Sequence, residues 1–137
     1  MTPAKRLRTA TFRPRLRALI ASSWLSRNTI ISFPGLLKHV LDTNLKEYVH
    51  KAVGVCGVSV GPFGGARMIQ SLVPVLRELG LVPIFWDVYF GTAGKLFDPA
   101  TGKITDPAYV GRLAKFLNEL VWMARALRYA RENIPAA

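Results

Sequence analysis

The residues best suited to chemistry form a glycine-rich loop after a short apolar run. The run is Ala52–Val58, rich in Val and bounded by Lys51 and by glycines, a pattern typical of a strand buried on both faces. The loop that follows holds Ser59, Gly61, Pro62, Phe63, Gly64 and Gly65. Such a loop brings bare backbone N–H groups close to a ligand, and in open α/β sheets ligands bind at this end of the strands. A tight turn without a ligand is the competing interpretation.

Other reactive side chains are isolated in the sequence. The single cysteine, Cys56, lies in the middle of the apolar run, so we interpret it as a small core residue and not as a nucleophile. His39 and His50 have no Cys or carboxylate at ligand spacing beside them. We therefore expect no metal site and no catalytic acid–base pair.

The 137 residues suffice for one domain, but their charge is unevenly distributed. Residues 1–32 hold seven of the 19 basic residues and no Asp or Glu, and the remainder holds twelve basic and eight acidic residues. Residues 1–32 also lack a helical or strand period, which sets a boundary between a basic arm, 1–32, and a folded part, 33–137. The arm could bind phosphate backbones, act as an organellar transit peptide, or be sequence never selected to fold with the rest.

The folded part alternates helical and strand patterns. We expect helices from about Leu36, from Ala66 and over Pro107–Arg131, with strands near Ala52–Ser59 and Leu81–Val88. Pro83 cannot donate to a β-ladder and places the second strand at a sheet edge. The stripe expected to be buried in the last helix is Val110, Leu113, Leu117, Leu120, Val121, Ala124 and Leu127. The alternation predicts an α/β fold with a parallel sheet and helices on both faces.

Four segments carry a family resemblance. They are Phe33–Lys38, Val58–Gly65, Val75–Gly80 and Lys95–Asp98. From Phe33 onward the chain resembles the C-terminal part of the NADPH-dependent FMN reductase family, a flavodoxin-like group that includes quinone, azo-dye and chromate reductases. The resemblance implies a three-layer sandwich around a five-stranded parallel sheet in the order 2-1-3-4-5.

The resemblance also implies a cofactor site and a reaction. Ser59 and Gly61–Gly65 would lie beside the isoalloxazine ring of FMN, with the backbone bonded to its pyrimidine end. NADPH would reduce the flavin, which would pass electrons to a quinone, azo or other small acceptor, so the protein needs no acid–base residue. A cytoplasmic homo-oligomer is expected, and no apolar run reaches the roughly 18 residues of a membrane span.

Two family elements have no counterpart in this sequence. One is the first strand with the loop that holds the FMN phosphate, and the other is the loop Pro-Glu-Tyr-Asn before Phe33. We therefore expect an incomplete sheet with its first strands missing, and a truncated, weakly active or inactive oxidoreductase. The alternative function is a small basic nucleic-acid-binding protein, but the arm lacks interleaved aromatic residues and any nucleic-acid-binding motif.

A shift of reading frame would explain the arm. If the frame begins on the third base of codon 26, the codons for Ser26–Ile31 can spell Pro-Glu-Tyr-Asn-His, and one leftover base restores the frame at Ser32. Upstream, Ser22–Leu25 allow mostly Val, Leu, Ile or Phe codons, as expected of a buried strand.

Sequencing the gene tests the frame hypothesis. We expect CCG GAA TAC AAT CAT or close synonyms in the shifted frame across codons 26–31. Any other bases there would leave the arm as a genuine basic segment. With the expected bases, neither nucleic-acid binding nor targeting should be inferred from it.

Overall fold

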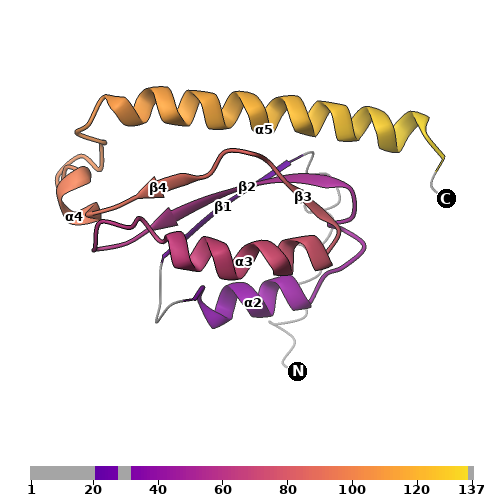
Figure 1. Cartoon of the computed structure of the whole chain (residues 1–137), viewed down its shortest axis with the longest axis horizontal. Coiled ribbons are helices and arrows are strands. Elements are labelled where there is room, and N and C mark those ends of the chain that lie inside the picture. The colour runs from indigo at the N-terminus through magenta and orange to yellow at the C-terminus, as the bar shows by residue number, and fades with distance from the viewer. Residues whose placement is uncertain (1–20, 28–31, 136–137) are drawn as a thin grey trace.

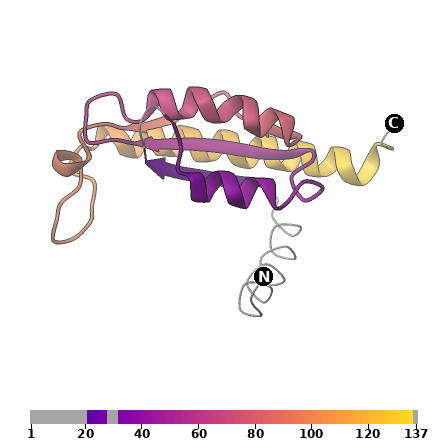
Figure 2. The ribbon, with the colours of Figure 1, turned by 90° about the horizontal axis from the view of Figure 1, so that it is seen from below.

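The computed structural model describes residues 21–27 and 32–135 and has three layers. Its sheet consists of β1 (Ala21–Arg27), β2 (Lys51–Val58), β3 (Leu81–Pro83) and β4 (Val88–Phe90). Helices α2 (Gly35–Asp42) and α3 (Ala66–Glu78) lie on one face, and α5 (Ala108–Asn133) crosses the other (Figure 1). Seen from the α2 and α3 side, α5 runs behind the sheet (Figure 2).

All described strand pairs are parallel. β2 is central, with β1 on one side and both β3 and β4 on the other. In the described part of the chain, β3 and β4 pair with β2 alone, so Pro83 lies on an edge strand as its missing N–H predicted. In the expected order 2-1-3-4-5, β1 fits the third strand, β2 fits the fourth, and β3 and β4 together fit the fifth.

Strand β1 lies within the segment that the sequence analysis assigned to the basic arm. Residues 21–27 lack a strand period, yet all seven pair with β2, from Ala21 beside Ala52 to Arg27 beside Val58. Pairing along a buried neighbour specifies this strand, and such a partner is invisible to a local pattern. The rest of the expected arm, residues 1–20 and 28–31, lies outside the described residues.

The prediction of one continuous strand over Leu81–Val88 is wrong, because the structure has two short strands, β3 and β4, in its place. β3 pairs with residues 51–53 of β2 and β4 pairs with residues 56–58, so residues 84–87 face only two residues of β2. The edge strand therefore has two more residues than β2 over this stretch, and we call residues 84–87 a bulge. The short helix α4 (Ala93–Leu96) was also not predicted.

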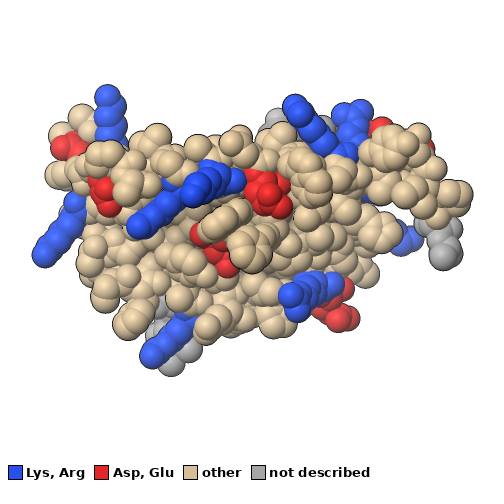
Figure 3. Space-filling view, turned by 45° about the horizontal axis from the view of Figure 1, so that its top comes forward, with Lys and Arg blue, Asp and Glu red and all other residues tan. Residues whose placement is uncertain are grey.

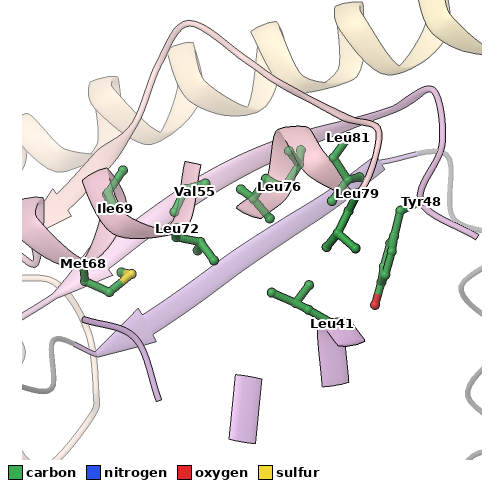
Figure 4. Close-up of a cluster of buried hydrophobic side chains, with 10 residues drawn as sticks. Leu41, Tyr48, Val55, Met68, Ile69, Leu72, Leu76, Leu79 and Leu81 are labelled. Atoms are coloured by element: carbon green, nitrogen blue, oxygen red, sulfur yellow. The ribbon is translucent and has the colours of Figure 1, made fainter. Parts of the chain in front are cut away.

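One core lies between the sheet and the α2–α3 layer. Figure 4 shows side chains from α3 and β2 meeting Leu41 of α2 and Tyr48 of the following loop. Gly80, at φ +76°, ends α3 where the sequence predicted a stop.

The second core lies between the sheet and α5, and its helix stripe differs from the prediction. Tyr109, Phe116, Leu120 and Ala124 are buried, whereas Val110, Leu117 and Val121 are exposed. The buried stripe is therefore rotated around the helix from the predicted one. Gly54 of β2 accommodates this arrangement: a Cβ there would lie 2.4 Å from the Phe116 ring, so the bare backbone leaves the space that the ring occupies.

Replacement of Gly54 by Ala should destabilise the fold. The added methyl overlaps the buried Phe116 ring, and overpacking of this kind costs about 1–3 kcal/mol. Gly111 in α5 is the matched control, because it is exposed and a Cβ added there would meet nothing within 4 Å. Gly111→Ala should stabilise by about 0.5–1 kcal/mol. Urea unfolding measures both, and equal midpoints for the two variants would contradict this account of the α5 contact.

Candidate functional site

The predicted glycine loop lies at the carboxyl end of β2. Residues 59–65 connect β2 to α3, and the arrowheads of β2 and β4 point to the same end of the sheet (Figure 1). The six predicted site residues, Ser59, Gly61, Pro62, Phe63, Gly64 and Gly65, therefore lie together in one continuous loop. Their role in flavin binding stays a prediction.

A second loop, which the sequence analysis did not assign to the site, holds the first in place. It follows β4 and contains Gly91, Thr92 and Ala93. The Ser59 N–H donates to the Phe90 carbonyl at 3.0 Å, the Thr92 N–H donates to the Gly61 carbonyl at 2.9 Å, and the Ala93 N–H donates to the Ser59 carbonyl at 3.1 Å. The signal for this loop was a pair of glycines, Gly91 and Gly94, directly after a predicted strand.

The glycine loop lies so close to the second loop and to β2 that side chains are excluded at Gly91 and Gly57. A Cβ on Gly91 would lie 2.3 Å from the Pro62 carbonyl oxygen, and one on Gly57 would lie 2.3 Å from the Gly64 carbonyl oxygen. Both contacts are with backbone, which cannot rotate away. Gly64 and Gly65 adopt φ of +56° and +81°, a region that favours glycine. The loop conformation is thus fixed by its own glycines and by those of its neighbours.

The loop presents backbone donors and apolar side chains to its surroundings. In the part of the chain that the structure describes, the N–H groups of the exposed Gly61 and Phe63 donate to no protein acceptor. The Ser59 hydroxyl donates to the Gly61 carbonyl at 2.8 Å and so braces the turn. Val60 and Phe63 are 91% and 75% exposed. Free N–H groups beside apolar side chains suit a flat ligand with acceptor atoms along one edge.

The isolated reactive residues lie outside this loop. Cys56 is buried in the core beneath α5, which confirms its interpretation as a packing residue. His39 and His50 are exposed. The described residues bring no three His, Cys, Asp or Glu side chains together in a metal-binding group.

One comparison with known proteins shows the fold, and a second shows the family. The fold matches FerB, a flavoenzyme NAD(P)H:(acceptor) oxidoreductase from Paracoccus denitrificans, with a TM-score of 0.74 and 21% identity over 85% of this chain and 67% of that one. The fold is therefore flavodoxin-like. Residues 25–95, more than half of the chain, match the model of the NADPH-dependent FMN reductase family, and the chain belongs to that family.

The extent of the family match bears on the boundary at residue 32. The match begins at residue 25, within β1, and includes the whole glycine loop and both glycines of the second loop. No curated protein matches the chain. Among the described residues, no helix has the length and apolar character needed to cross a bilayer.

Gly91→Ala should detach the two loops from each other. Its methyl collides with the Pro62 carbonyl, so the hydrogen bond from Thr92 to Gly61 should break, and exchange of the Thr92 amide hydrogen should accelerate about tenfold. Gly94→Ala, three residues along the chain with nothing near the added carbon, is the control and should leave exchange unchanged. Slow exchange in the Gly91 variant would refute the proposed contact.

Proposed function

We propose that the Ser59–Gly65 loop binds the ring of FMN in a flavin-dependent oxidoreductase that uses NADPH. The observation that carries the proposal is the pair of free N–H groups of the exposed Gly61 and Phe63, which suit the carbonyl and nitrogen acceptors at the pyrimidine end of the ring. Membership of the NADPH-dependent FMN reductase family supports it.

Within this proposal the protein binds and orients, and the cofactor supplies the reaction. Bound FMN would supply hydride acceptance from NADPH and electron transfer to a quinone, azo or other small acceptor. The residues of the loop position the ring through fixed backbone groups, and Ser59 holds the Gly61 carbonyl in place. Phe63 and Val60 would cover part of the ring and exclude water from it.

We further propose that the chain contacts only the ring. A dianionic phosphate normally requires oriented N–H groups at a helix N-terminus. The family places that grip after the first strand, for which this sequence has no counterpart. The chain alone should therefore bind FMN weakly, and its activity should be low.

The alternative of nucleic-acid binding gains no support from the face of the molecule shown in Figure 3. On the face shown in Figure 3, Lys and Arg side chains are separated by acidic and uncharged residues. A nucleic-acid interface requires a continuous basic stripe or patch. We therefore keep the flavin proposal as the function that the geometry supports best.

A comparison of FMN with riboflavin tests ring-only binding. Since the phosphate makes no contact in this proposal, the two dissociation constants should agree within about twofold, as measured by quenching of flavin fluorescence. Ser59→Ala removes the brace on Gly61 and should weaken both ligands by about 2–10-fold.

Ser71→Ala is the matched control for that experiment. Ser71 donates to the Met68 carbonyl within α3, away from the loop, so this variant should bind flavin like the unmodified chain. Tight stoichiometric quenching by FMN with weak riboflavin binding would contradict ring-only binding. Absence of binding by both flavins would contradict the flavin proposal itself.

A further inference from the structure

The interruption between β3 and β4 creates a feature that the flavin proposal does not use. Residues 84–87 leave the β-ladder, and Ile84 is buried beneath α5. The next two residues, Phe85 and Trp86, are 82% and 44% exposed, with their rings edge to face at 5.1 Å. Bulges that expose aromatic side chains often redirect them toward a ligand.

A cavity of about 270 Å³ lies beside this bulge. It is lined by Trp86, Asp87, Val88, Tyr89, Arg112 and Lys115, from the edge of the sheet and the first turns of α5. Drug-sized ligands occupy roughly 300–1,000 Å³, so this cavity fits a smaller molecule of about two fused rings.

Two cations border the cavity without a carboxylate partner. Among the described residues, neither Arg112 nor Lys115 forms an ion pair. Instead, the Arg112 guanidinium lies 4.8 Å from the centre of the Tyr109 ring, and the Lys115 ammonium lies 6.0 Å from that of Trp86. Cations placed against aromatic rings remain available to an anion.

The acidic member of the lining has a different partner. The Asp87 carboxylate accepts a hydrogen bond from the Tyr89 hydroxyl at 3.2 Å. Burial raises the pKa of Asp87, and this hydrogen bond lowers it by less. One oxygen of Asp87 is thus engaged, and the group can accept a further hydrogen bond from a ligand.

We propose that this cavity binds a small planar aromatic anion that also carries a hydrogen-bond donor. The ring would lie against Trp86 and Tyr89, the anionic group would meet Arg112 and Lys115, and the donor would reach Asp87. None of the cavity residues belongs to the Ser59–Gly65 loop, and the two sites meet only where Tyr89 packs against Gly64.

The probe for this site is 6-hydroxy-2-naphthoate, which has two fused rings, a carboxylate and a hydroxyl. We expect saturable binding with one molecule per chain, measured by calorimetry and by the fluorescence of the probe. Two relatives should each bind at least about tenfold more weakly: 6-hydroxy-2-naphthalenemethanol, which lacks the charge, and 4-hydroxycyclohexanecarboxylate, which lacks the planar ring.

Variants assign the binding to the cavity. Trp86→Ala and the double variant Arg112→Gln with Lys115→Gln should each weaken the probe at least about tenfold. The matched control is Lys103→Gln with Arg125→Gln, which removes the same charge from exposed positions outside the lining. Unchanged unfolding midpoints in urea should accompany all of these variants, since the altered side chains are exposed.

A double-mutant cycle tests the role of Asp87. Removal of the hydroxyl, with 2-naphthoate as ligand, should weaken binding in the unmodified chain but not in Asp87→Ala. Equal binding of the probe and its two relatives, or equal loss in the control variant, would overturn the proposal. Displacement of the probe by FMN, at a concentration that saturates the flavin site, would also overturn it, because the cavity would then be part of the flavin site.

Discussion

The positions of α5 and of the glycine loop both depend on two glycines of β2, Gly54 and Gly57. Gly54 faces α5, where its bare backbone admits the Phe116 ring, and Gly57 faces α3, where it admits the Gly64 carbonyl. Any larger residue at the first position would lift α5 from the sheet, and at the second it would push the glycine loop outward. α5 is also fixed at both ends, by the bond from the Tyr109 hydroxyl to the Tyr89 carbonyl and by the Arg131 guanidinium on the His50 carbonyl. The position of the loop and the position of the long helix are thus both set by one strand.

Local patterns were enough to predict most of the elements but not all of their partners. Helices α2, α3 and α5, the buried strand and the edge position of Pro83 follow from the period of the apolar residues and from the positions of proline and glycine. β1 was missed because its seven residues carry no alternation and owe their conformation to pairing with β2. The bulge at residues 84–87 was missed because its sequence, Ile-Phe-Trp-Asp, has the apolar and aromatic residues that are typical of a strand.

The candidate site shows the same division. Its first loop was predicted in full because glycine, proline and a preceding apolar run are adjacent in sequence. Its second loop becomes a neighbour only because Gly57 pairs beside Tyr89, 32 residues further along the chain. The buried stripe of α5 also involves a distant residue. Phe116 is buried against Gly54 of β2, whereas Leu117, which the helical period predicted to be buried, is exposed. Contacts between segments that are distant in the sequence cannot be predicted from the pattern of a short stretch of residues.

The parallel pairing of β2 with β4 has a consequence for how the chain acquires its shape. No described strand can find its neighbour through a tight hairpin, so every pairing must close a long crossover first, which makes folding slow for the size of the domain. During synthesis the glycine loop leaves the ribosome before the backbone groups that hold it. It can take its final form only after Gly91 to Ala93 have also emerged. Until then the unpaired edge of β2 is open to other chains, and this interval is when aggregation competes with folding.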